Sequence, residues 1–168
     1  IFSNLSVSAK LSGNTEVAKN KNVYNDHDDS LEKSQWLSLI CDSTKNAIEF
    51  SDYVFINLQF LAGNRIVFWD YIYQFKEYLC DIAIWDKGHG APAMAHRVMN
   101  NVFAMIFIFS KENQSRAIGK KDFRGTVENI FRITPQRSNE YADIHGASFP
   151  VQLPYQIINT FSNREGLI

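Results

Sequence analysis

Four histidines are the first side chains in this sequence that could do chemistry, by binding a metal. They are His27, His89, His96 and His145. A metal site on a helix needs a second ligand on the same face, usually four residues along the chain, and none of the four has one at that spacing. The histidine pattern therefore predicts no metal site.

The two cysteines, Cys41 and Cys80, stand alone without a CxxC pair. This spacing argues against a zinc site and against a disulfide framework. It fits a reducing compartment, so the expected location is the cytoplasm.

Acidic residues and a lysine near one strand end raise the possibility of a nuclease site. Asp81 with Asp86 and Lys87 resembles the acidic-plus-lysine cluster of restriction nucleases, but the residue that usually separates the last acid from the lysine is missing. Scattered Asp and Lys side chains near strand ends are common on protein surfaces. The chain also contains no GxSxG, GxxxxGK(S/T) or GxGxxG motif. Generic catalytic residue types therefore define no site.

The charge distribution is uneven although the net charge is only −1. Residues 11–54 carry four lysines against eight acidic residues, a net charge of −4 that repels polyanions. Residues 111–137 carry seven basic against three acidic residues, a net charge of +4, interrupted by Gly119, Gly125 and Pro135. This basic segment is either a phosphate-gripping loop or a solvated surface with salt bridges.

Length and composition set the frame that must position these residues. At 168 residues, 45% hydrophobic and 21% charged, the chain suits one globular domain with a buried core. No apolar run approaches the roughly 20 residues that span a bilayer, so no membrane association is expected. The N-terminal stretch lacks the basic start and long apolar run of a secretory signal.

Hydrophobic periodicity predicts helices over residues 28–50 and 63–79, and a third over 154–161. The first is expected to open with an Asp or Ser cap. Its expected buried stripe is Leu31, Trp36, Leu39, Ile40, Ala47 and Ile48. The second helix has a wide apolar face, made of Ile66, Trp69, Ile72, Tyr73 and Phe75 to Lys76.

Compact apolar runs predict strands over residues 52–60, 80–87 and 102–111, the first covered on both faces. A strand, helix and strand in succession predict an α/β fold with a mainly parallel sheet and helices on both faces. The loops after Leu58 and Trp85 are then the expected ligand-binding positions. Between the predicted strands 80–87 and 102–111, a short helical turn is expected around Met94 to Met99. Residues 125–134 are a further strand or part of a recognition loop.

Three sequence blocks carry a resemblance to a known family. They are IWDK at residues 84–87, HRVMN at 96–100 and HGASFPVQLP at 145–154. With their surroundings, from about Tyr24 to Ile168, they resemble the site-specific DNA amino-methyltransferases with permuted motif order. Members transfer a methyl group from S-adenosylmethionine to adenine N6 or cytosine N4, and the choice between the two bases stays open. The resemblance implies a partial Rossmann-like methyltransferase sheet, mainly parallel with an antiparallel edge.

The family flips its target base into a pocket, where an aromatic residue stacks on it. Its catalytic motif is Asp/Ser/Asn-Pro-Pro-Tyr/Phe. The matching stretch here, IFSNLSVS at residues 1–8, contains neither the prolines nor the aromatic residue in that arrangement. Ala104 stands where the family pattern usually has glutamate. No catalytic residue is therefore assigned.

The family binds its cofactor with an Asp-Pro-Phe-x-Gly-x-Gly turn after a short strand. REGLI, at residues 164–168, resembles the approach to that strand, and the turn itself is not in the sequence. His145, Phe149 and Pro150 match the segment that lies against the cofactor pocket, although Phe149 is equally suited to anchor the following helix. We expect S-adenosylmethionine to be the family cofactor and not to bind this chain alone.

The resemblance also implies DNA contacts. The expected DNA-binding residues are Lys87, His89, Arg97, Arg116, Lys120, Lys121, Arg124 and Arg137. Two structural alternatives stay open. Trp85 can be a core residue while Asp86 and Lys87 cap the loop, and Arg97 can pair with a nearby carboxylate.

We expect one partial methyltransferase-like domain over residues 1–168. Within it, the resemblance assigns residues 1–23 to the altered catalytic-motif region, 24–110 to the α/β core, 111–145 to a basic recognition-like segment and 146–168 to the helix beside the cofactor pocket and the start of the missing strand. Such a chain is a fragment, a split subunit or a degenerate copy of a DNA methyltransferase. The alternative is a non-enzymatic DNA-binding or protein-interaction module on the same fold. A sheet without its cofactor strand exposes edges, so a complementary subunit or a homodimer is expected.

Overall fold

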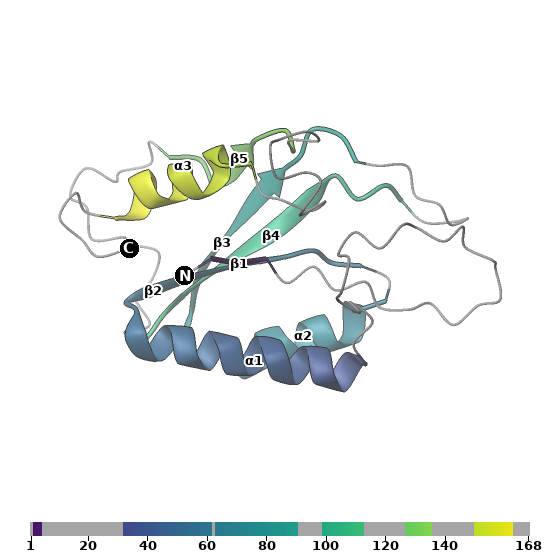
Figure 1. Ribbon diagram of the computed structural model, residues 1–168, viewed down its shortest axis with the longest axis vertical. Helices are drawn as coiled ribbons and strands as arrows, with labels where there is room; N and C mark the ends of the chain where they lie inside the picture. The colour runs from purple at the N-terminus through teal and green to yellow at the C-terminus, as the bar shows by residue number, and fades with distance from the viewer. Residues whose placement is uncertain are drawn as a thin grey trace, which may run out of the picture.

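The computed structural model describes residues 32–61, 63–90, 99–112, 127–135 and 150–162, and the backbone of residues 2–4. The elements in chain order are β1 (Phe2–Asn4), α1 (Lys33–Phe50), β2 (Tyr53–Leu58), α2 (Arg65–Gln74), β3 (Leu79–Asp86), β4 (Phe103–Ser110), β5 (Ile130–Arg132) and α3 (Gln152–Phe161) (Figure 1). The helical turn expected around Met94 falls mostly outside these residues.

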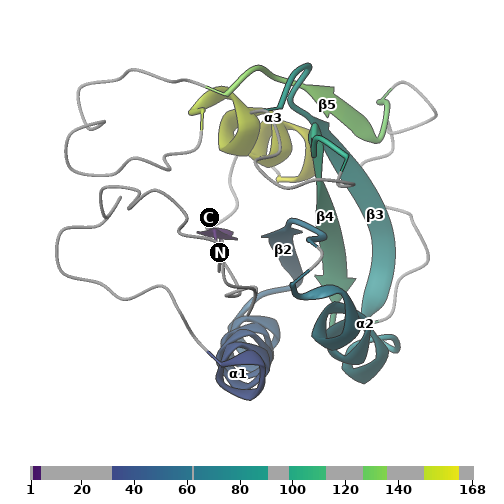
Figure 2. The same cartoon turned by 90° about the vertical axis from the view of Figure 1, so that its right-hand side faces the viewer.

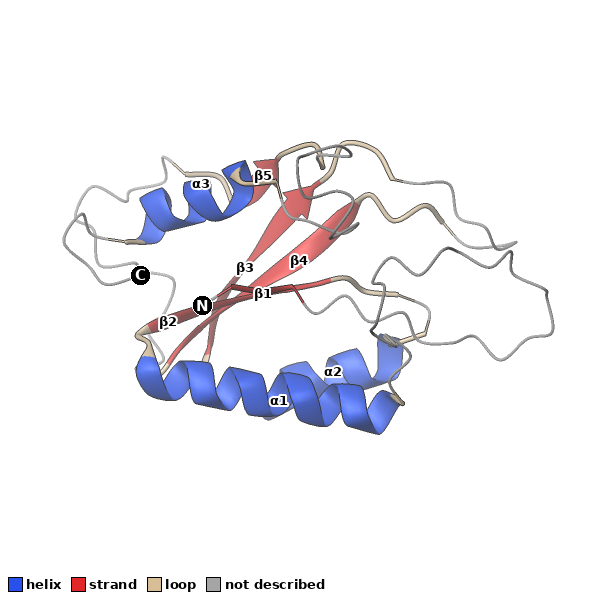
Figure 3. Cartoon of the chain, viewed as in Figure 1, coloured by secondary structure: helices blue, strands red, loops and turns tan. Residues whose placement is uncertain are grey.

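The described elements form a three-layer α/β arrangement. A five-stranded sheet lies in the middle, with α1 and α2 on one face and α3 on the other (Figures 1 and 3). The predicted α/β class and the helices on both faces are confirmed. The three predicted strands are present with ends shifted by one or two residues, and the strand considered within residues 125–134 is β5.

The prediction of a mainly parallel sheet with an antiparallel edge is wrong. The strand order is β1-β2-β4-β3-β5, and β4 pairs antiparallel with both β2 and β3, inside the sheet. Only the short pairings β1 with β2 and β3 with β5 are parallel. The α2 crossover does make β2 and β3 point the same way. However, the chain after β3 re-enters the sheet at the end where β3 finished, so β4 runs antiparallel and separates them.

Helix α1 buries one stripe, as predicted, but with a different start and partly different members. It begins at Lys33 after Glu32, whose backbone N donates to Gln35 Oε1 at 3.2 Å in a capping box. The expected Asp or Ser cap lies outside the described residues, as does Leu31. The buried residues of α1 are Trp36, Ile40, Cys41, Thr44, Ala47 and Ile48. Leu39 was predicted to be buried and is exposed.

The predicted apolar face of the second helix is right for Phe75, which is buried, and for Ile72, which packs partly buried against the core, but wrong for its other apolar members. Helix α2 buries Phe68 and Tyr71, followed by Phe75 at its C-cap, while Ile66, Trp69 and Tyr73 are exposed. The helix is apolar around most of its circumference, so periodicity alone does not select a face. It also ends at Gln74, because a turn of residues 75–78 leads directly into β3.

Polar groups join α1 and α2 inside their shared interface. Thr44 Oγ1 and Tyr71 Oη are both buried and lie 2.9 Å apart in a hydrogen bond, and Cys41 Sγ donates to Gln74 Oε1 at 3.3 Å. Burial raises the pKa of the Tyr71 phenol far above its usual range and raises the pKa of the Cys41 thiol. Both groups therefore stay protonated and act as hydrogen-bonding core residues.

The two faces of the sheet carry separate hydrophobic clusters. Alternate residues of β2 point to opposite faces: Val54, Ile56 and Leu58 belong to the cluster under α1 and α2, whereas Phe55 belongs to the cluster under α3. On the α3 face, Leu153 and Ile157 pack against the sheet, and the Phe161 ring lies 4.9 Å from that of Phe55. The sheet is thus buried on both sides, as predicted for residues 52–60.

Candidate functional site

In open α/β sheets, ligands usually bind at the carboxyl ends of the strands. Here that position is the end of the sheet where β2, β3 and β5 finish. Because β4 runs the other way, it starts at this same end. We call residues 59–61, 87–90, 99–102 and 133–135 the carboxyl edge. Figure 2 shows α3 on one side of the sheet and α1 and α2 on the other.

Hydrogen bonds join the segments of the carboxyl edge. Asn101 Nδ2 donates to the Phe60 carbonyl at 2.9 Å, and Lys87 N donates to the Val102 carbonyl at 2.9 Å. Ile133 N donates to the Asp86 carbonyl at 3.0 Å. The ends of β2, β3 and β5 are therefore held together as one surface.

The loop after β3 is shaped by one carboxylate and two glycines. Asp86 Oδ1 accepts a hydrogen bond from Gly88 N at 2.8 Å, and Gly88 has a φ of +71°, which favours glycine. A Cβ atom on Gly90 would lie 2.6 Å from the Asn101 carbonyl oxygen, so only glycine allows this close approach. The backbone that presents Lys87 and His89 is thus tightly constrained.

Trp85 and Lys87 form the inner part of this loop. The Trp85 indole is buried and its Nε1 donates to the Ile133 carbonyl at 2.7 Å. The Lys87 ammonium lies 5.0 Å from the centroid of the Trp85 ring, and partial burial lowers the pKa of Lys87. The structural alternative is confirmed for Trp85, which is a core residue, and for Asp86, which caps the loop.

The predicted DNA-binding residues are only partly within the described structure. Lys87 is half-buried and His89 exposed, both at the carboxyl edge. Six others lie outside the described residues: Arg97, Arg116, Lys120, Lys121, Arg124 and Arg137. Four of these six, Arg116 to Arg124, lie between the described residues Glu112 and Val127. These two flanking residues do not lie together at the carboxyl edge. Glu112 follows the far end of β4, and Val127 lies beside Asp81 of β3. The DNA-binding role of all eight stays a prediction.

Among the predicted cofactor-binding residues, only Pro150 is described. Its side chain is fully buried, and its carbonyl accepts a hydrogen bond from Leu153 N at 3.0 Å at the start of α3. His145 and Phe149 lie outside the described residues. A buried proline ring offers no surface to a ligand, so Pro150 adds no support for a cofactor contact.

Two polar side chains at or near the carboxyl edge were not identified as site residues from the sequence. Asn101 bridges β2 and the start of β4, and its Oδ1 also accepts from Phe103 N at 3.2 Å. The Asn-Asn pair before an apolar run is a turn signal, but it does not reveal which carbonyl the amide reaches. Close by, at the end of β2, Asn57 Oδ1 is buried and has no hydrogen-bond partner within the described part of the chain.

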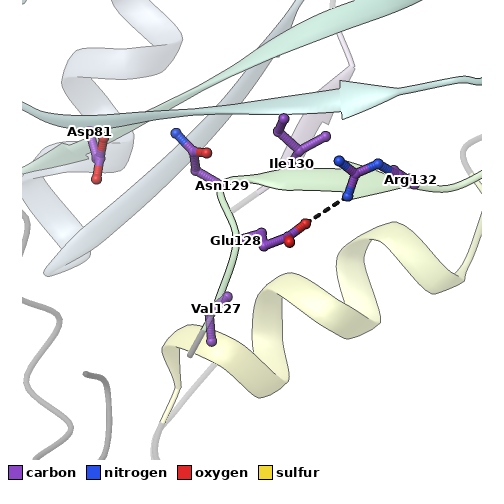
Figure 4. A pocket seen from close by; sticks show the side chains of 6 residues that line it. All are labelled: Asp81, Val127, Glu128, Asn129, Ile130 and Arg132. Carbon is purple, nitrogen blue, oxygen red and sulfur yellow. Dashed lines mark hydrogen bonds and ion pairs between the residues drawn. The ribbon is translucent and has the colours of Figure 1, made fainter. Parts of the chain in front are cut away.

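An open hollow of about 400 Å³ lies beside β5 (Figure 4). Its lining residues are Asp81, Val127, Glu128, Asn129, Ile130 and Arg132. Arg132 Nη1 lies 2.6 Å from Glu128 Oε2 in an exposed ion pair. This pairing, together with the carboxylate of Asp81, makes the hollow unfavourable for a phosphate group.

Two other kinds of feature are absent from the described ranges. These ranges contain no group of three or more His, Cys, Asp or Glu side chains placed to hold a metal ion. No helix among the described residues is both long and apolar enough to cross a membrane.

The sheet order and helix layers place the chain among proteins with a methyltransferase-like α/β fold. The PvuII DNA methyltransferase, which is cytosine-N4-specific, superposes with a TM-score of 0.59 over 82% of this chain at 16% sequence identity. The match spans 58% of that protein's length. At this identity the likeness concerns the fold.

The sequence itself shows the family. The N6/N4 methyltransferase model, described as DNA methylase, matches residues 13–168. This range is most of the chain, which therefore belongs to the N6/N4 DNA methylase family. No curated protein sequence matches it significantly.

Proposed function

We propose that this chain takes part in methylating an exocyclic amino group of DNA, adenine N6 or cytosine N4, with S-adenosylmethionine as methyl donor. The observation that carries the proposal is the family match over residues 13–168. The methyltransferase-like fold supports it. The DNA would lie along the carboxyl edge, where Lys87 and His89 are presented by a loop of constrained shape.

The chain's own residues suggest a supporting part in this reaction. Its four prolines, Pro92, Pro135, Pro150 and Pro154, are never adjacent, so the sequence holds no Pro-Pro catalytic motif. It also holds no Asp-Pro-Phe-x-Gly-x-Gly turn. We propose that the chain alone does not transfer methyl groups, and that a complementary segment or subunit supplies both motifs. S-adenosylmethionine, when bound, would supply the electrophilic methyl group.

Lys87 would contribute to DNA binding by meeting a phosphate. Its ammonium group lies over the Trp85 ring, 5.0 Å from the centroid, which favours one position of the side chain. A lysine already held in place loses less conformational entropy on binding than a free one. Partial burial removes water from the Lys87 ammonium and so disfavours its charged form. A phosphate group bound beside it would offset this loss of hydration.

Replacing Lys120, Lys121 and Arg124 with alanine should weaken duplex binding and reduce the slope of log K against log salt by about 2–3, because each lost phosphate contact removes about 0.9 from that slope. Lys87→Ala should also weaken duplex binding and should reduce the same slope by about 0.9, the value of one phosphate contact. Fluorescence anisotropy with a labelled duplex, at several salt concentrations, measures both quantities.

The matched control is the double replacement of Lys33 and Lys45 by alanine, which removes two exposed charges from α1 in the acidic half of the chain. It should leave affinity and slope nearly unchanged. Equal losses in the control would mean that binding depends on net charge. Unchanged binding in the basic-segment variant would remove that segment from the DNA-binding surface.

A further inference from the structure

We infer that the outer face of α2 binds the same face of a second copy of this chain, with the two α2 helices parallel about a two-fold axis. This inference does not depend on the proposed function. It begins with three apolar side chains on the side of α2 that faces away from the sheet: Ile66, Trp69 and Tyr73, which are 63%, 56% and 69% exposed. Figure 3 shows α2 beside α1, on the same face of the sheet.

The spacing of these residues is that of a helix-pairing seam. Ile66, Trp69 and Tyr73 are separated by three and then four residues, so they occupy successive a, d and a positions of a heptad. They project from one side of α2, while Phe68 and Tyr71 anchor the other side in the core. Trp69 is held in place by the Phe68 and Phe60 rings, whose centroids lie 5.5 and 6.0 Å away.

Charged residues flank the seam on opposite sides. In this register, Arg65 occupies position g of the preceding heptad and Asp70 occupies position e, and both are exposed. In a parallel pair of helices, position g of one copy lies next to position e of the other copy five residues further on. Five residues after Arg65 is Asp70. A parallel two-fold pair therefore places Arg65 of each copy beside Asp70 of the other.

The same charges disfavour the antiparallel arrangement. When two identical helices pack face to face antiparallel about a two-fold axis, equivalent edges of the two helices meet. Arg65 of one copy and Arg65 of the other would then line the same edge of the interface. Like charges at an interface oppose association and select against that register. The pattern thus favours a second copy in one orientation.

The exposed aromatic surface sets the strength of the association. An aromatic side chain can bury about 150–250 Å², so the exposed parts of Trp69 and Tyr73 supply roughly 200–300 Å² per copy. A standard stable interface buries about 800 Å² per partner. The pairing is therefore expected to be weak, with a Kd on the order of 100 μM.

Sedimentation equilibrium of the full chain between about 1 and 500 μM tests the inference. Wild-type chain should form dimers within this range. Asp70→Arg should raise the Kd at least about 5-fold, and so should Arg65→Asp, because each leaves like charges facing each other. The double variant Arg65→Asp with Asp70→Arg exchanges the two charges and should return the Kd to within about 2-fold of wild type. Asp52→Arg, with the same charge change outside α2, is the control and should change little.

Cross-linking tests the orientation. With Cys80 replaced by serine, Ile66→Cys should form a disulfide between copies under mild oxidation, because position 66 meets its own counterpart in a parallel pair. Gln156→Cys, on α3, should not. A chain that stays monomeric at 500 μM, charge variants with unchanged Kd, failure of the double variant to recover, or a lack of the position 66 cross-link would each overturn the inference.

Discussion

Replacing Phe68 with alanine should lower the free energy of unfolding by about 3–5 kcal/mol, the range typical of truncating a buried aromatic residue. Phe68 is fully buried, and its ring centroid lies 5.2 Å from that of Phe60 and 5.6 Å from that of Phe107. Its loss leaves a cavity between α2 and β4. Urea denaturation followed by circular dichroism measures the change from the shift in midpoint at constant slope.

The control for Phe68 is Ile66→Ala on the same helix. Ile66 is exposed, so this change should alter the free energy of unfolding by less than about 0.5 kcal/mol at a few micromolar protein. The pair of variants tests which face of α2 is buried. If Ile66→Ala were the more costly of the two, the face predicted from periodicity would be right and the described packing wrong.

Replacing Trp85 with alanine should also cost about 3–5 kcal/mol, and Trp85→Phe about 1–3 kcal/mol. The phenylalanine variant keeps most of the packing but leaves the Ile133 carbonyl without the indole Nε1 donor that lies 2.7 Å away. Since Ile133 follows β5, we expect the loss to weaken attachment of β5 to β3. Amide hydrogen exchange at Phe131 and Ile133 reports that attachment.

His89→Ala is the control in the same loop. His89 is exposed, so its removal should leave the free energy of unfolding within about 0.5 kcal/mol of wild type. A fully stable Trp85→Phe variant would show that the hydrogen bond to Ile133 does not hold the carboxyl edge together.

The strands were predictable from sequence because they are dense apolar runs, and β2 and β4 are buried on both faces. β2 alternates its side chains between two hydrophobic clusters, and such a run has few other stable environments. The order of the strands was not predictable. Local patterns specify that 103–110 is a strand, but its insertion between β2 and β3 depends on long-range pairing with both neighbours.

Helix faces were predictable where the helix is amphipathic. α1 has a polar side, so most of its buried residues were identified from spacing, with Leu39 as the error. α2 is apolar nearly all round, and burial is decided by its contacts with α1 and the sheet, such as the hydrogen bond between the hydroxyl groups of Tyr71 and Thr44.

The candidate site was predictable only in position. The loop after Trp85 was identified because strand ends are ligand-binding positions in α/β sheets. Two hydrogen bonds shape this loop. The bond between Gly88 N and Asp86 Oδ1 depends on the local backbone conformation, and the bond between Asn101 Nδ2 and the Phe60 carbonyl joins residues 41 positions apart in sequence. No local pattern encodes those partners.

Transfer of a radiolabelled methyl group from S-adenosylmethionine to duplex DNA tests the proposed function most directly. The chain is assayed alone and mixed with the products of the reading frames on either side of its own. We expect DNA labelling in the mixture and none with the chain alone. Labelling by the chain alone would contradict the need for a complementary segment, and no labelling in either assay would contradict a role in DNA methylation.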